Sequence, residues 1–343
     1  MMRNGPASIY TARSGLKIVL YILPFLMVFI SLFTGRYSIS PANTVRALGN
    51  LLGGSSDVPI EIYTLVVNVR FPRALAAGAV GAGLAVSGAA FQGVFRNPLV
   101  SSGLLGVSSG AGFGAALAIV AGAGMAGTYP LAFVFGIEAV FISYWIARVY
   151  KSTPAIMLIL GGTITSSVFS SLISLMKYVA DPETQLPGIV YWLMGSLASV
   201  GWESFPALIP IAAGCVILML MSWRINVLSM GDKEARTLGV NVGRDKLLII
   251  GGASLATAGA VCMSGMIGWV GLVIPHIGRM ITGNDNRRLI PVSMALGASF
   301  MILIDLVSRT LTGQEIPLGI LTSLIGAPFF VYLLKKTKGG GWR

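Results

Sequence analysis

Two acidic side chains, Glu138 and Asp305, lie deep inside apolar stretches of this 343-residue sequence. Carboxyl groups in such surroundings are typical of carriers that couple transport to protons or sodium ions. Arg309 follows Asp305 by four residues, so the two would share one face of a helix, and an intrahelical ion pair is the structural interpretation. Glu138 has no obvious partner. It is either a structural acid or part of a wet pathway, and the residues leave both readings open.

Other chemistry finds little support in the sequence. His276 is the single histidine and cannot build a metal site alone. Cys215 and Cys262 both lie in apolar segments and imply no disulfide framework. No GxxxxGK[ST] phosphate loop, HExxH or CxxC motif occurs. We therefore expect no metal site and no ATP hydrolysis by this chain, and we do not expect an enzyme.

Three arginines near the ends of apolar segments could bind carboxylates. Arg70 and Arg73 lie in the segment VRFPRAL, and Arg309 lies near the end of a later apolar segment. Long side chains at a membrane interface can simply extend towards water. A guanidinium group can also grip a carboxylate with two parallel hydrogen bonds, which a lysine cannot do.

A polar island at 223–246 interrupts the apolar chain and holds 8 of its 36 charged side chains. Ser229 is a possible helix cap, Asp232 and Glu234 suit a helix N-terminus, and Gly239 can end a helix. One interpretation is a solvated loop on lipid headgroups. The other is a pair of short helices that contact a soluble partner, and composition alone does not decide between them.

Composition indicates an all-α integral membrane protein. The chain is 55% hydrophobic and 10% charged, whereas soluble domains carry roughly 25% charged residues. A soluble fold of this kind would expose large apolar patches. The net charge of +12 is scattered between apolar segments, which argues against nucleic acid as a partner. We interpret these charges as signals of membrane topology.

About ten segments are long and apolar enough to be transmembrane helices. With ten spans both termini lie on one side, and 18 of the 24 basic residues fall on that side. The positive-inside rule then places both termini and the island in the cytoplasm. Outside, Ser40-Pro41 begins a predicted surface helix over about 41–52, and another is predicted around Tyr191–Leu197. The ten spans are about 16–34, 72–91, 103–123, 128–147, 155–178, 204–222, 247–265, 269–283, 290–311 and 318–334.

Four long segments resemble the permease subunits of type II ATP-binding-cassette importers for iron–siderophore, haem and vitamin B12. They occur in the family's order and extend the resemblance over essentially the whole chain, so residues 1–343 are expected to form one transmembrane permease domain. The segments are VRFPRALAAGAVGAGLAVSGAAFQGVFRNPLVSSGLLGVSSGAG at 69–112, LSMGDKEARTLGVNV at 228–242, GMIGWVGLVIPHIGRMITGNDNRRLIPVS at 265–293 and EIPLGILTSLIGAPFFVYLL at 315–334.

The resemblance implies partners and roles. A homodimer would form the translocation path at its interface, with two cytoplasmic ATPase subunits below it and one periplasmic or lipid-anchored binding protein above. No cofactor is expected in this chain, since ATP and Mg would bind the ATPase. Arg70, Arg73 and Arg309 match the family's docking arginines. The residues that match its coupling helices are Leu228, Ser229, Gly231, Asp232, Glu234, Ala235, Arg236, Leu238 and Gly239.

The substrate stays open among the classes that such permeases move. Iron–siderophore or haem is our first expectation for a protein of the cell membrane with this resemblance. Cobalamin and oxyanions such as molybdate are alternatives within the family. An ion-coupled secondary carrier that uses Glu138 and Asp305 is the alternative outside it.

Overall fold

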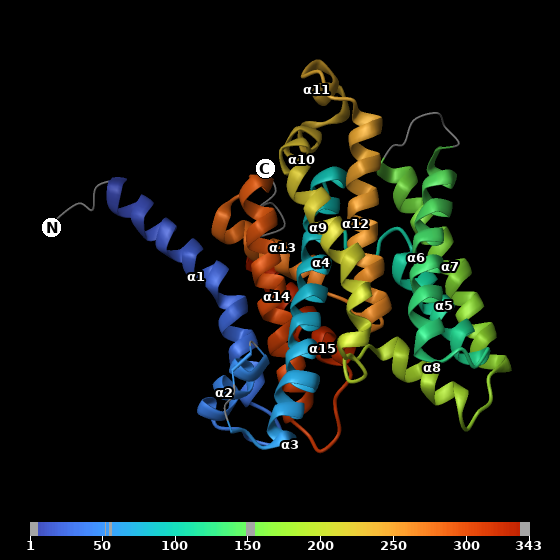
Figure 1. The fold of residues 1–343 in the computed structure, drawn as a ribbon. Coiled ribbons are helices and arrows are strands. Elements are labelled where there is room, and N and C mark those ends of the chain that lie inside the picture. Colours follow the sequence, from blue (N-terminus) through green and yellow to red (C-terminus); the bar gives the residue numbers. More distant parts are fainter. Residues whose placement is uncertain (1–5, 52, 55–56, 149–154, 337–343) are drawn as a thin grey trace.

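The computed structural model describes residues 6–51, 53–54, 57–148 and 155–336, and these ranges contain helices and no strand (Figure 1). Six helices are long and apolar enough to cross a membrane, and four shorter apolar helices of 10–17 residues accompany them. Each of the ten predicted spans corresponds to one of these, which confirms the polytopic all-α fold. The ten helices are α1 (Pro6–Phe33), α4 (Phe71–Phe95), α5 (Val107–Val120), α6 (Gly124–Ala147), α7 (Ala155–Val179), α9 (Leu208–Leu220), α12 (Val242–Ser264), α13 (Val270–Thr282), α14 (Asn286–Thr310) and α15 (Leu318–Lys336).

Helix α4 lies at the centre of the molecule and is buried along most of its length (Figure 1). Its glycines and alanines allow α14 and α12 to pack closely against it. A Cβ atom on Gly81 would overlap the Gly297 carbonyl group, and a Cβ on Gly297 would overlap that of Gly81. The backbones of α4 and α14 are therefore in direct contact, and these two helices form the core of the fold.

Helices α5, α6 and α7 form a second group, which packs on the core through α12. Helix α9 covers α12 and α4 on another side. The short helix α13 is about 20 Å long, less than the thickness of a bilayer. Pro275 lies inside it, and most of its side chains are buried against α4 and α14. This agrees with the expectation that an interrupted helix needs protein around it.

The outer end carries the short helices. Helix α2 (Pro41–Leu51) confirms the predicted surface helix, and the Ser40 hydroxyl accepts a hydrogen bond from the Asn43 amide at 3.3 Å. The helix predicted at 191–197 is instead α8 (Gln185–Met194). It begins earlier because the Asp181 carboxylate accepts the amide protons of Glu183 and Thr184 just before it. The remaining short helices at this end are α3 (Ile60–Tyr63), the π-helix η1 (Thr64–Arg70) and the 3-10 helix η3 (Trp202–Ala207).

At the opposite end, α10 (Ser222–Met230) and α11 (Asp232–Thr237) extend beyond the bundle (Figure 1). The predicted cytoplasmic island is therefore a pair of short helices and not a loop. The following span begins at Val242 instead of 247, because the Asn241 side chain accepts the Arg244 amide proton at 3.1 Å and caps α12. Helix α1 begins and α15 ends in this same half of the molecule (Figure 1).

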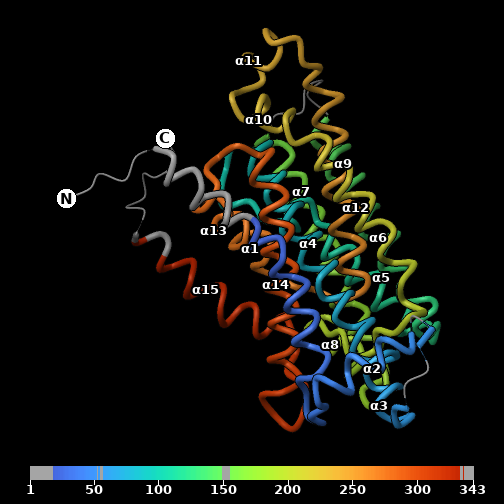
Figure 2. The backbone as a smooth tube through the Cα atoms, turned by 60° about the vertical axis from the view of Figure 1, so that its left-hand side comes forward, coloured from blue at the N-terminus to red at the C-terminus, as the bar shows by residue number. Residues whose placement is uncertain are grey.

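Helix α15 stands apart from the other helices. Its first turns pack near α13, α14 and α8, and the rest slants away from the bundle (Figure 2). Several of its large apolar side chains are exposed, among them Leu324 and Tyr332. The chain by itself therefore leaves one membrane helix largely uncovered.

Candidate docking and coupling sites

Arg73 is the centre of a buried ion cluster at the outer end. Its Nε donates to Asp305 Oδ1 at 2.8 Å, and its two terminal nitrogens donate to the Glu315 oxygens at 2.9 Å each. Asp305 is 1% exposed, and the Glu315 side chain is 27% exposed. Arg309 Nε lies 3.4 Å from Asp305 Oδ2, which confirms the predicted ion pair four residues apart. Asp305 thus serves two arginines from two helices.

Arg70 and Arg309 bind the end of α1. Arg70 donates to the carbonyl groups of Leu32 at 2.7 Å and Tyr37 at 2.5 Å. Arg309 donates to the Thr34 carbonyl at 3.0 Å and to both oxygens of Ser31 at 2.6 Å. All three predicted docking arginines are therefore buried and occupied within the chain. Their role in docking a binding protein stays a prediction.

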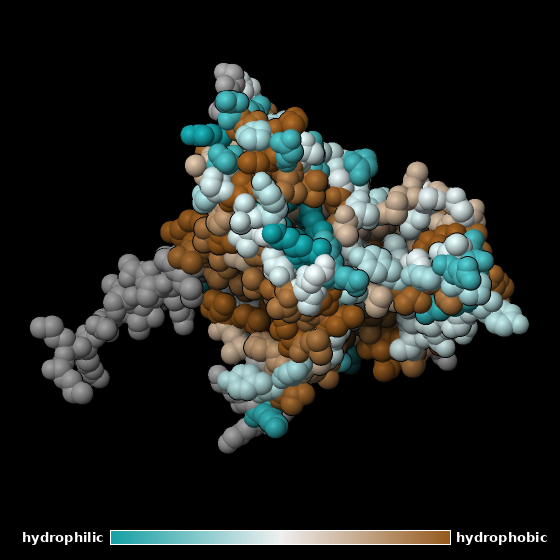
Figure 3. Space-filling model, turned by 90° about the horizontal axis from the view of Figure 1, so that it is seen from below, coloured by the Kyte–Doolittle hydropathy of each residue, from teal (hydrophilic) through white to brown (hydrophobic). Residues whose placement is uncertain are grey.

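A small outer pocket of about 200 Å³ is lined by Arg70, Arg73, Arg309 and Glu315, together with Arg36 and Tyr37. Arg36 is exposed and was not singled out from the sequence. Burial raises the pKa of Glu315. The hydrogen bond from Arg73 and the charges of Arg73, Arg36 and Arg309 together lower this pKa by more than burial raises it, so the net shift is downward. Four arginines against two carboxylates leave the pocket positive, and Figure 3 shows hydrophilic side chains gathered near the middle of this end.

The cytoplasmic pair α10–α11 has a buried side and an exposed side. Leu228, Gly231 and Ala235 are buried and hold the pair against the bundle. Of the other predicted coupling residues Asp232 is half-buried, and those that are exposed are Ser229, Glu234, Arg236, Leu238 and Gly239. Leu238 is 57% exposed and the neighbouring Met230 is 61% exposed. Apolar side chains presented at a soluble end are typical of an interaction surface.

Gly231 forms the corner between α10 and α11, with φ +133° and ψ 155°. A residue with a side chain rarely adopts this conformation, and a Cβ here would overlap the Glu234 carboxylate. Ser229 is not the cap that its position suggested, because its hydroxyl donates to the Asn226 carbonyl within α10 at 2.7 Å. Gly239 follows the end of α11 with φ +75°, as predicted.

Several polar contacts join this pair to the membrane helices, among them an ion pair between Arg224 of α10 and Asp245 of α12 at 3.6 Å. Lys246 is 4% exposed and donates to Asp232 Oδ2 at 2.7 Å, so it holds the start of α11 instead of anchoring a span at the membrane surface. Asn226 donates to Asp285 Oδ1 at 2.7 Å and accepts from the backbone and side-chain nitrogens of Asn286 at 2.8 Å each. Asn226 thereby ties α10 to the first turn of α14.

Sequence reasoning missed the role of Asn226. The only local signal was Asp285, whose carboxylate caps α14 by accepting the Arg287 amide proton at 3.0 Å. The sequence also contains the pattern GVSSG at 106–110, which matches the GxSxG motif of hydrolases. Because this pattern begins the apolar helix α5 and does not follow a strand, it predicts no hydrolase.

Glu138 lies on the outward face of α6, in one stripe with Val134, Phe141 and Trp145, all of them exposed. It makes no ion pair with any residue that the structure describes. Glu138 and Asp305 therefore differ in structural role. Asp305 is neutralised by arginines, whereas Glu138 faces out of the chain.

Helix α7 exposes a stripe of hydroxyl side chains. Thr163, Ser167, Ser170 and Ser174 recur at helical spacing and are all exposed, with Ser171 beside them. Some of these hydroxyls donate to carbonyl groups one turn back, which lowers the cost of placing them in a membrane. The adjacent exposed stripe of the same helix is apolar, with Leu160, Ile164 and Val168 among its members. The outward surface of α7 is thus divided into a polar and an apolar half.

Comparison with known proteins identifies relatives along most of the chain. The model of the FecCD transport family matches residues 22–336. The molybdate import system permease protein of Haemophilus influenzae is 43% identical over 91% of this chain and 93% of its own length. The cobalamin import system permease protein of Halobacterium salinarum is 40% identical over 86% of this chain and 79% of its own. A solved inward-facing structure of a metal-chelate type ABC transporter aligns with a TM-score of 0.84 and 41% identity, over 94% of this chain and 99% of that one.

Proposed function

This chain belongs to the FecCD transport family as a multi-pass permease of an ATP-binding-cassette importer, and we propose that it is itself non-catalytic and that its cargo is a metal chelate delivered by a binding protein. Iron–siderophore and haem come before cobalamin in this proposal. The likeness to a metal-chelate type transporter over 94% of the chain supports that class. ATP would be hydrolysed by separate cytoplasmic subunits.

The hydroxyl stripe of α7 is the observation that carries the proposed path. Lipid offers no hydrogen-bond partners for a row of hydroxyl groups, so this face is better matched by water or by another polar surface. Neutral hydroxyls hold no fixed charge that would retain an ionic cargo. A path lined in this way suits a bulky polar ligand that must pass without being trapped.

A second copy of the chain would complete the path. Helix α15 leaves much of its apolar surface uncovered, and α7 exposes an apolar stripe beside its hydroxyls. Both faces would be covered in a homodimer with the hydroxyl stripes turned towards the shared axis. Cysteines that replace Ser170 and Ser174 should then form disulfides between copies, whereas a cysteine that replaces Phe141 on α6 should not.

Coupling would occur through α10 and α11. The buried Leu228 and Ala235 fix the pair to the bundle, and the exposed Met230 and Leu238 form its free apolar surface. We expect this surface to seat in a groove of the ATPase. Leu238→Glu should abolish co-purification of the ATPase, while Thr237→Glu, also exposed and adjacent, serves as the control.

Docking at the outer end would use the positive pocket as a whole. Arg70, Arg73 and Arg309 shape the pocket and supply its field, and Arg36 is the exposed cation at its edge. Arg36→Glu should weaken docking of an acidic binding protein, most strongly at low salt. Arg46→Glu on α2 makes the same charge change at an exposed position outside the pocket.

Reconstitution in liposomes tests the function directly. With its ATPase and binding protein, the chain should import iron chelate or haem only when ATP is supplied on the side of the membrane where the ATPase is bound. The chain alone should show neither ATPase activity nor uptake. Uptake by the chain alone under a proton gradient would refute the importer and favour a secondary carrier that uses Glu138.

An oxyanion is the second candidate cargo. The 43% identity to the Haemophilus influenzae molybdate permease favours it, and the neutral hydroxyl path does not exclude a small anion. Parallel uptake of labelled molybdate, iron chelate and cobalamin in the same vesicles separates the three. Uptake of molybdate alone would replace the metal chelate as cargo.

A further inference from the structure

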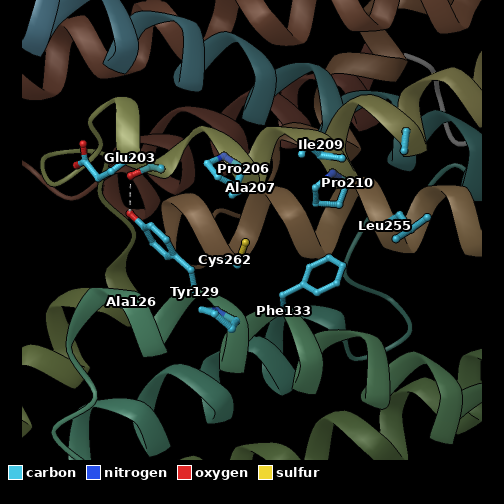
Figure 4. Close-up of a pocket in the computed structure, with 13 residues that line it drawn as sticks. Ala126, Tyr129, Phe133, Glu203, Pro206, Ala207, Ile209, Pro210, Leu255 and Cys262 are labelled. Atoms are coloured by element: carbon cyan, nitrogen blue, oxygen red, sulfur yellow. Dashed lines mark hydrogen bonds between the residues drawn. The ribbon is translucent and has the colours of Figure 1, made fainter.

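A cavity of about 680 Å³ opens in the membrane-spanning surface between α6 and α9. Tyr129 and Phe133 of α6 form one wall, Pro206 and Pro210 form the other, and Leu255 and Cys262 of α12 form the floor (Figure 4). Small side chains, among them Ala207 and Ala213, leave the space between the two walls unfilled. The cavity is lined almost entirely by apolar atoms.

The cavity lies in the outer half of the membrane. Its residues come from the first ten of α6, the last ten of α12 and the segment where η3 passes into α9. They extend along about 10 Å of each helix. Ile209 and Ala213 at its edge are exposed, so the cavity opens sideways towards the surrounding medium. At this depth the medium is the hydrocarbon of the outer leaflet.

Polar groups gather only at the outer end of the cavity. The hydroxyl groups of Tyr129 and Ser204 lie 3.3 Å apart and bridge α6 to η3 (Figure 4). Glu203 is exposed beside them, and its carboxylate folds back over Gly201. Within the described ranges Glu203 forms no ion pair. No lysine or arginine lines the cavity.

We propose that this cavity binds a phospholipid with a protonated amine headgroup, such as phosphatidylethanolamine, from the outer leaflet. One acyl chain fills the space between α6 and α9, because an apolar cavity open to hydrocarbon has no reason to hold water. The ammonium group pairs with Glu203, and the hydroxyls of Tyr129 and Ser204 are available to the phosphate or ester oxygens. The missing cation disfavours a lipid whose headgroup has only negative charge.

Photolabelling tests the proposal on the purified full chain in nanodiscs of phosphatidylcholine and phosphatidylglycerol. Two probes with the same diazirine-bearing acyl chain are compared, one with an ethanolamine and one with a choline headgroup. Peptides covering 124–133 and 206–213 should be labelled, and the outward face of α6 at 134–145, which lies outside the proposed dimer interface, is the reference for bulk lipid. We expect the ethanolamine probe to be favoured in the cavity about twofold to fivefold, because its ammonium group can donate hydrogen bonds to the Glu203 carboxylate and the equally charged quaternary ammonium of choline cannot.

Two variants separate the acyl and headgroup contacts. Ala213→Phe should remove labelling of the cavity by both probes, whereas Ala212→Phe, the same enlargement at an exposed position of α9 outside the cavity, should leave it intact. Glu203→Gln should keep the labelling but abolish the preference for ethanolamine. Equal labelling by both probes in the original chain would overturn the proposal, as would full labelling of Ala213→Phe. Disulfide formation between copies through a cysteine at Ile209, in place of lipid labelling, would assign the cavity to a dimer interface.

Discussion

Removal of the Asp305 carboxylate is the sharpest test of the outer ion cluster. Asp305→Ala leaves Arg73 with Glu315 alone and Arg309 with only the neutral oxygens of Ser31 and Thr34, in surroundings where Asp305 is 1% exposed. Breaking one partner out of a buried ion pair costs about 3–5 kcal/mol. Glu315→Ala removes two hydrogen bonds from a partly exposed carboxylate and should cost about 1–2 kcal/mol.

Unfolding in mixed detergent and SDS micelles measures both changes, with binding-protein affinity as the second assay. The double variant Arg73→Met/Asp305→Leu should recover part of the stability lost in Asp305→Ala, because apolar side chains can replace a buried pair, while Arg309 and Glu315 each still lose an ion-pair partner. Suppose instead that Asp305→Ala unfolds like the original chain and binds the binding protein more tightly. Arg73 would then be a docking residue that Asp305 keeps from its partner, and its ion pair would not stabilise the fold.

Three further predictions concern the coupling segment and pH. Asn226→Ala removes the hydrogen bonds to Asp285 and Asn286 and should lower uptake per ATP hydrolysed while the ATPase still assembles; an unchanged ratio would contradict a role in coupling. Gly231→Ala places a side chain at φ +133° and should destabilise the α10–α11 corner by about 1–3 kcal/mol, whereas Gly251→Ala, which meets no atom within 4 Å in mid-helix, should be neutral or stabilising by thermal unfolding. The pKa of Glu315 lies below 4.5, so its contribution to stability should be complete above pH 4.5 and disappear as pH falls through the lower folded value. Glu315→Gln should remove that part of the pH dependence, and an unchanged acid profile would refute the assignment.

Hydropathy and charge predicted the helices because the bilayer imposes its length and polarity on each span separately. The same local reasoning found the Asp305–Arg309 pair, whose members are four residues apart. It could not find that Arg73 binds Asp305 and Glu315, which lie 232 and 242 residues further along the chain. Those contacts exist only because α4 and α14 pack together.

The polar island shows the same division between local and tertiary signals. Its charge pattern predicted a short helix that ends at Gly239, and α11 agrees. The pattern gave no indication that Lys246 would be buried against Asp232, since a lysine beside a membrane span is usually exposed. The resemblance to known permeases supplied arginine positions but not their burial, which depends on how the end of α1 wraps over Arg70 and Arg309.

The direct backbone contact between α4 and α14 provides an internal distance that should stay constant while other parts of the protein move. Two helices that meet at Gly81 and Gly297, and that are clamped again by Arg73 and Asp305, have little freedom to slide. A pair of spin labels on these two helices should therefore report one constant distance through every step of transport. Distances from a third label on α15 to that pair would then report the movement of α15 relative to the α4–α14 core. These distances do not depend on how the molecule tilts in the bilayer.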